Sequence, residues 1–170
     1  KDHCDSMSGS LQLYFKTLMS SGLTHDKAIK VLTIPLFGIG SLLTSPQNGL
    51  VLGTFFLIGG LWLSPDLDTV STTLGRWGPL KIIWWPYRKS IPHRSIFSHS
   101  PFLGNIIKIF YLIMVLLLSN EITKFLGLEH TFFSVEIGRE IISKYPEKIK
   151  LMLIGIETST WVHLLLDSDP

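Results

Sequence analysis

Long runs of apolar residues alternate with shorter polar segments along this chain, and each run predicts a helix. Residues 50–63, 102–118 and 149–167 are the three strongest runs, and they carry no charged residue except Lys108 in the second and Lys150 and Glu157 in the last, until the last ends at Asp167. No period-two alternation typical of strands stands out. The pattern predicts an all-α fold, a bundle of about five to seven hydrophobic helices.

The N-terminal part of the chain has weaker signals. Residues 11–18 predict a short helix, and Thr24 is a good N-cap for a helix that begins at His25. Pro35 is expected to kink or restart that helix, because proline has no backbone N–H. The cluster Thr-Ser-Pro-Gln-Asn-Gly at 44–49 predicts a turn before the first strong apolar run.

Two segments lack a strong apolar run. Residues 69–92 contain two glycines and three prolines, which predicts an irregular loop with short helical turns. Its tryptophans and tyrosine suit a membrane–water interface, although packing of the loop onto the domain explains them equally well. Residues 119–146 are more polar and predict a loop followed by an amphipathic helix.

The composition points away from an ordinary soluble domain. The 170 residues are 46% hydrophobic and only 16% charged, whereas an average soluble domain carries roughly 25% charge. This balance favours a membrane protein or a heavily buried helical one. Runs of about 14–17 residues are marginal for crossing a bilayer, so a soluble bundle whose apolar helices form its core stays an alternative. The single Cys4 excludes an internal disulfide and a cysteine-based zinc ribbon.

Charge is unevenly distributed. The segment 69–101 carries five basic residues and no acidic one, so we describe it as an irregular basic loop. A basic loop beside an apolar helix is expected on the cytoplasmic side of a membrane, and it would equally suit phosphate or anionic headgroups. We interpret residues 1–18 as a non-native or disordered extension and residues 19–170 as one helical domain, with a C-terminus that is expected to be truncated.

Histidines and aspartates lie next to the apolar runs, and together they predict a metal site. Imidazole and carboxylate are the ligand set of zinc, manganese and iron sites. Ionisable groups beside membrane-like segments are costly and are functional candidates by default. We expect a divalent ion, with zinc favoured and manganese or iron as alternatives. The candidate ligands are His25, Asp66, Asp68, His93, His99, His163 and Asp167.

The spacing of two pairs supports this prediction. His163 and Asp167 are four residues apart and share one helical face, so both reach one ion or Asp167 orients the imidazole. Asp66 and Asp68 repel each other unless a cation lies between them, and acids are poorly placed at the C-terminal end of a helix. The competing interpretation is that these are ordinary polar residues that end or cap helices.

A third cluster lies in the sequence His-Arg-Ser-Ile-Phe-Ser-His-Ser at 93–100. His93 and His99 meet only if this segment turns or winds as a helix. Arg94 carries a planar guanidinium that suits phosphate oxygens. The alternative is a helix-capping cluster with incidental histidines. No nucleophile elbow, Walker loop or dinucleotide glycine loop is present in the sequence.

The order His…Pro-Asp-x-Asp…His-Arg-Ser-x-x-Ser-His-Ser…His-x-x-x-Asp, over residues 19–167, resembles an uncharacterised bacterial family described as metal-binding proteins. More remotely it is similar to the YdjM-type membrane-bound metal-dependent hydrolases. Thr69 stands where those hydrolases carry a histidine, and Ser95 and Ser98 stand where they carry glycine and threonine. Both groups look like distant relatives of zinc phospholipase C, which implies an all-α fold and phosphodiester chemistry.

Two functional hypotheses follow. The favoured one is a membrane-associated metal-dependent hydrolase of the bacterial inner membrane, with Asp68 as general base and Arg94 holding a phosphoester or other anionic substrate. Its expected partners are membrane lipids and an anionic small molecule or lipid, and no nucleic acid. The rival is a non-catalytic membrane protein with a structural or storage metal. A soluble cytoplasmic form remains the alternative localisation.

Overall fold

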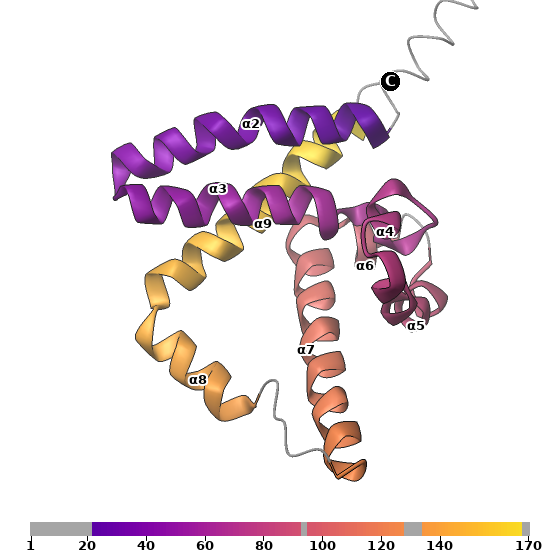
Figure 1. Ribbon diagram of the computed structural model, residues 1–170. Coiled ribbons are helices and arrows are strands. Elements are labelled where there is room, and N and C mark those ends of the chain that lie inside the picture. Colours follow the sequence, from indigo (N-terminus) through magenta and orange to yellow (C-terminus); the bar gives the residue numbers. More distant parts are fainter. Residues whose placement is uncertain (1–21, 93–94, 128–133, 168–170) are drawn as a thin grey trace, which may run out of the picture.

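The computed structural model describes residues 22–92, 95–127 and 134–167, and every regular element in those ranges is a helix (Figure 1). The predicted all-α class is therefore confirmed. The expected helix at 11–18 and the interpretation of residues 1–18 as an extension lie outside the described residues.

Helices α2 (Gly22–Leu43) and α3 (Pro46–Trp62) form an antiparallel hairpin (Figure 1). The turn predicted at 44–49 is shorter than expected. Ser45 caps α3 by accepting a hydrogen bond from the Asn48 N–H at 3.2 Å, and Pro46 occupies the first helical turn, where its missing N–H costs nothing. Pro35 was expected to kink or restart the helix, but α2 does not restart there, because packing along α3 outweighs one lost backbone hydrogen bond.

Helix α9 (Pro146–Asp167) packs across α3 through two glycines. A methyl group added at Gly155 would lie 2.7 Å from the Leu52 carbonyl oxygen, and one added at Gly59 would lie 2.8 Å from the Ile156 Cα. Both distances are shorter than those that a Cβ atom makes to its neighbours, so neither position has room for a side chain. Small residues therefore bring the two backbones into direct contact, as in many membrane helix pairs.

A module of short helices follows α3, as the glycines and prolines of residues 69–92 predict. Its core contains Leu67 and Trp84, both fully buried, and the ring of Tyr87 packs edge-on against Trp84. Trp85, in contrast, is 60% exposed, so only some of the aromatic side chains pack this segment onto the domain. The elements are η1 (Pro65–Asp68), α4 (Thr72–Gly75), η2 (Gly78–Ile83), α5 (Trp84–Ser90) and α6 (Ile96–His99).

Arg76 attaches this module to the hairpin. Its guanidinium donates to the Leu61 carbonyl oxygen at 2.7 Å and forms an ion pair with Asp26 of α2. The C-terminal end of α3 is thereby tied to the beginning of α2. This holds η1, which follows α3 directly, close to His25.

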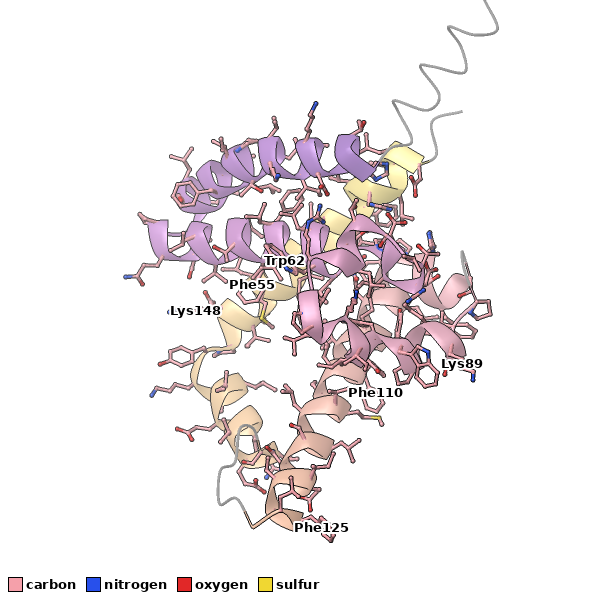
Figure 2. All side chains as sticks on the ribbon, turned by 45° about the vertical axis from the view of Figure 1, so that its right-hand side comes forward. Phe55, Trp62, Lys89, Phe110, Phe125 and Lys148 are labelled. Carbon is pink, nitrogen blue, oxygen red and sulfur yellow. The ribbon has the colours of Figure 1, made fainter. Side chains whose placement is uncertain are left out.

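Helix α7 (Pro101–Phe125) leaves the other long helices soon after it begins, and α8 (Val135–Lys144) precedes α9 (Figure 1). In a chain that spans a membrane, the three long apolar helices are expected to pack as adjacent helices. Helix α3 does pack along α9, but α7 is joined to α9 mainly near its start, where the Asn105 amide donates to Glu157 at 2.8 Å and to Thr160 at 2.9 Å. Phe110 and Phe125 project from the remainder of α7 and are 62% and 91% exposed (Figure 2).

Three segments are long and apolar enough to cross a membrane: Pro46–Asp68, Pro101–Phe125 and Pro146–Asp167. Each is longer than the corresponding run predicted from the sequence. The segment Pro46–Asp68 begins earlier and continues past the end of α3 at Trp62 through η1, α7 ends later, and α9 begins earlier. The marginal lengths that left the soluble bundle open are therefore extended to about the 20 residues a bilayer requires.

Candidate metal centre

Three elements bring four of the predicted ligands to one end of the helix hairpin. His25 lies in the first turns of α2, Asp66 lies in η1, and His163 and Asp167 occupy the last turns of α9. Ser64 and Pro65 end α3 and start η1, which turns the first aspartate toward α9. One ligand atom from each of His25, His163 and Asp167 lies within 4.8 Å of the others.

The separations between these atoms suit a shared ion. The Asp167 carboxylate lies 3.3 Å from His25 Nε2 and 3.3 Å from His163 Nε2, and an Asp66 oxygen lies 3.6 Å from His163 Nε2. Two ligand atoms bound at 2.0–2.2 Å to one tetrahedral ion are about 3.3–3.6 Å apart. Both Nε2 atoms are buried and lack a hydrogen-bond partner among the described residues. The donor set and its spacing therefore fit a divalent metal.

The other edges of the two imidazoles face each other. The Nδ1 atoms of His25 and His163 lie 2.9 Å apart, and the Ser64 hydroxyl lies 3.3 Å from His163 Nδ1. Without an ion, one ring donates from Nδ1 and the other accepts. If both Nε2 atoms bound a metal, each neutral ring would carry its proton on Nδ1, so the two Nδ1 atoms would no longer share a hydrogen bond and would have to move apart from 2.9 Å. Ser64 would then accept the proton of His163.

Burial and the charge of His163 favour the neutral form of the His25 imidazole, which is the form that binds a metal. Burial lowers its pKa below the ordinary value of 6.5, and the nearby His163 lowers it further, whereas the carboxylates of Asp167 and Asp66 act in the opposite direction. The side chain is 7% exposed. A lowered pKa keeps the imidazole neutral at neutral pH, and the neutral form is the one that binds metals.

The centre is closed on its histidine side and open on its carboxylate side. The side chains of His25 and His163 are 7% and 4% exposed, but those of Asp167 and Asp66 are 28% and 32% exposed. A metal held between them would have protein on one side and solvent on the other. An accessible coordination position is the feature that separates catalytic zinc sites from closed structural ones.

Asp68 and His99 form a second pair at the same end of α3. An Asp68 oxygen lies 3.6 Å from His99 Nδ1, and the Ser98 hydroxyl lies 2.9 Å from that nitrogen. The Asp68 side chain is fully buried. Burial raises the pKa of the Tyr87 phenol, and the Asp68 carboxylate raises it further, so this hydroxyl stays protonated. Asp66 and Asp68 thus face different histidines from one turn.

The remaining two predicted site residues, His93 and Arg94, lie outside the described residues. Of the seven candidate ligands, the structure therefore describes six. Three of them, His25, Asp66 and Asp167, lie around His163. The other two, Asp68 and His99, form a separate pair.

Sequence reasoning missed two residues that shape the site. Ser64 was recognised only as the end of a helix, although it is buried and reaches His163. Lys108 was not singled out in the sequence as a site residue, but it is 1% exposed and donates to the Leu63 carbonyl oxygen at 2.6 Å. Glu157, Asp68 and Asp66 surround its charge. A lysine inside an apolar run was the available signal, because such a charge requires partners.

Comparison with known proteins agrees with a metal centre. Residues 20–169 match the model of the family described as uncharacterized metal-binding protein (DUF2227), and the chain belongs to this family. It is also 47% identical over 61 residues to an uncharacterized protein of Aquifex aeolicus (strain VF5). That match spans 35% of this chain and 43% of the Aquifex protein. No solved structure matches the chain.

Proposed function

We propose that this protein is a membrane-associated metal-dependent hydrolase whose ion is held by His25, His163 and Asp167, with Asp66 beside them. The observation that carries the proposal is the geometry of the two buried Nε2 atoms, which share the Asp167 carboxylate at 3.3 Å on each side, with an Asp66 oxygen 3.6 Å from that of His163. Metal binding itself agrees with the family to which the chain belongs. Zinc is favoured for this donor set, with manganese or iron as alternatives.

The open carboxylate side supports catalysis over a closed structural site. An ion in this position would lower the pKa of a bound water toward neutrality and supply a nucleophile. Asp167 lies between the two imidazoles and would bind the ion, whereas Asp66, which is 32% exposed, would accept the proton of that water. Asp68, the base predicted from the sequence, would serve a second ion beside His99, because its carboxylate faces that imidazole.

Membrane association is supported by the exposed apolar surface of α7 and by the three segments of spanning length. We further propose that the basic loop 69–101 lies on the cytoplasmic side, since cytoplasmic loops are enriched in lysine and arginine. Because η1 follows directly from α3, the metal centre would lie at the membrane surface, where the headgroups of lipids are within reach. The substrate class that fits this position is a phosphoester or another anionic compound.

The test compares hydrolysis by metal-depleted and metal-reloaded protein on a panel of phosphomonoesters, phosphodiesters and phospholipids. The proposal expects one substrate class to be turned over only after reloading. His99→Ala should lower metal affinity if the Asp68–His99 pair holds a second ion. Arg94→Ala should leave the metal content near that of the wild type, because a guanidinium does not bind cations, and should lower kcat/KM by roughly the 1.5–3 kcal/mol of a charge-assisted hydrogen bond.

The second candidate function is a non-catalytic membrane protein whose ion joins its helices. One observation favours it: the ligands come from α2 and α9, near the two ends of the described chain, so a metal would link them. In that case reloading would raise the thermal stability but produce no turnover on any substrate. Loss of metal in Arg94→Ala would show that Arg94 supports the ligand loop and does not hold a substrate.

A further inference from the structure

The module that follows α3 contains a pocket away from the candidate metal ligands. Its volume is about 680 Å³, and its walls come from α4, η2 and α5. Lys81 and Arg88 line it together with the apolar side chains of Leu74, Ile82 and Trp85. No carboxylate is among the residues that line it, which leaves its positive charge uncompensated from within.

Arg88 is the most informative of these residues. Its Nε atom is buried and has no hydrogen-bond partner among the described residues. A buried donor of a charged group is costly to leave unpaired, so such an atom indicates a ligand that accepts hydrogen bonds. The planar guanidinium is matched to the oxygens of phosphate or carboxylate.

The rim of the pocket is apolar and exposed. Ile82 is 75% exposed and Val70 84%. Trp85 also faces outward, and the Lys89 ammonium lies 5.2 Å from the centre of its ring, at the outer edge of the module (Figure 2). Tryptophan, lysine and exposed aliphatic side chains in one patch are typical of protein surfaces that contact the headgroup layer of a bilayer.

We propose that this pocket binds the phosphate of an anionic phospholipid. Lys81 and Arg88 would hold the phosphate, and Ile82 and Trp85 would contact the glycerol and upper acyl region. The apolar rim favours a lipid over free phosphate, because a soluble anion gains nothing from exposed isoleucine and tryptophan. The inference rests on the membrane association proposed above, and it requires neither a bound metal nor hydrolysis.

Such a site would also orient the metal centre. Ser71, which caps α4 at the pocket wall, donates its hydroxyl proton to the Asp66 carbonyl oxygen at 2.8 Å. A lipid held by η2 and α5 would therefore be connected through one hydrogen bond to the turn that bears Asp66. A lipid in the pocket would keep η1, which bears Asp66, at the depth of the lipid headgroups.

The experiment measures lipid retention by native mass spectrometry of the detergent-purified protein. The test variant is Lys81→Gln with Arg88→Gln. The matched control is Lys144→Gln with Lys148→Gln, which removes the same charge from α8 and α9. Phosphatidylglycerol and phosphatidylcholine are compared at equal concentration. Because each basic residue near an anionic surface contributes about fivefold, the test variant should retain phosphatidylglycerol roughly tenfold less well or worse, and the control should stay within about twofold of the wild type.

Several outcomes would overturn the proposal. Equal losses in the two double variants would indicate general attraction between charges. Equal retention of the two lipids by the wild type would exclude a site for anionic headgroups. Displacement of phosphatidylglycerol by millimolar inorganic phosphate would show that the pocket binds free phosphate. If the double variant does not fold, Lys81→Gln alone, at an exposed position, should still lower retention several-fold.

Metal content is measured on the same samples so that the two proposals fail separately. The lipid proposal expects the test variant to keep the metal content of the wild type. A wild-type protein that retains phosphatidylglycerol but no metal would contradict the proposed function and leave the lipid site intact.

Discussion

The Nδ1 atoms of His25 and His163 lie 2.9 Å apart, although 138 positions separate the two residues in the chain. The contact joins the beginning of α2 to the end of α9. It also leaves both Nε2 atoms facing the Asp167 carboxylate, which is the arrangement from which the proposed metal centre follows.

A substitution at Ser64 tests whether its hydroxyl orients the His163 imidazole. Ser64→Ala removes an acceptor for the Nδ1 proton of His163 and should weaken metal binding without abolishing it, by about 10–100-fold as for other groups that orient a ligand. Isothermal titration of metal-depleted protein measures the change. Ser159→Ala is the control, since Ser159 is equally buried but donates only to its own helix. Equal effects of the two variants would remove the assigned role of Ser64.

The pKa of His25 in metal-depleted protein should be below 6.5, and neighbouring substitutions should shift it in opposite directions. Burial is the main cause of the lowering, and the charge of His163 adds to it, so His163→Gln should raise the pKa. Asp167→Asn removes an effect that raises it and should lower the pKa further. Because protonation of His25 is disfavoured in the folded chain, its contribution to stability is present above pH 6.5 and is lost as the pH falls through the folded-state value. Histidine NMR resonances report both shifts, and shifts of the same sign would contradict the account.

Gly155 should tolerate no side chain. Gly155→Leu would push α9 away from the Leu52 carbonyl and should destabilise the fold by at least the roughly 1–3 kcal/mol of an overpacked core. Gly38→Ala in α2 is the control, because no atom outside its own helix lies within 4 Å of the added methyl group. That variant should be neutral or more stable by about 0.5–1 kcal/mol, the difference in helix propensity. Thermal unfolding in detergent, followed by circular dichroism, distinguishes the two.

Lys108 should be essential because its partners are buried with it. Lys108→Met leaves Glu157 and Asp68 without their shared cation and should cost about 3–5 kcal/mol, as when one member of a buried ion pair is removed. Adding Glu157→Gln should recover part of that loss, since one uncompensated charge disappears. Chemical unfolding of both variants measures the difference. If the double variant is less stable than the sum of the single changes predicts, attraction to the Glu157 carboxylate is not the reason that Lys108 is buried.

The local parts of this structure were predictable from the sequence, and the long-range parts were not. The i, i+4 relation of His163 and Asp167 follows from helix geometry alone, and Ser64-Pro65 marks the end of α3 in the sequence. The module at 69–92 was expected to contain short helical turns, because its glycines and prolines interrupt any longer element.

What the sequence could not predict depends on contacts between distant elements. Asp66 and Asp68 look equivalent in the sequence, yet η1 directs one toward His163 and the other toward His99. The continuation of α2 through Pro35 and the burial of Lys108 likewise depend on neighbouring helices. Helical periodicity carries no information about which helix lies next to another, so the divergence of α7 had no local signal.

The most direct test of the metal centre is the metal content of purified protein, measured by mass spectrometry of the elements after reloading with zinc, manganese or iron. The wild type should hold at least one ion per chain, and Asp167→Asn should lose it. Asp26→Asn should retain it, because Asp26 is adjacent to His25 but is paired with Arg76. A wild type that binds none of the three metals, or an Asp26→Asn variant that loses as much metal as Asp167→Asn, would contradict the proposed site.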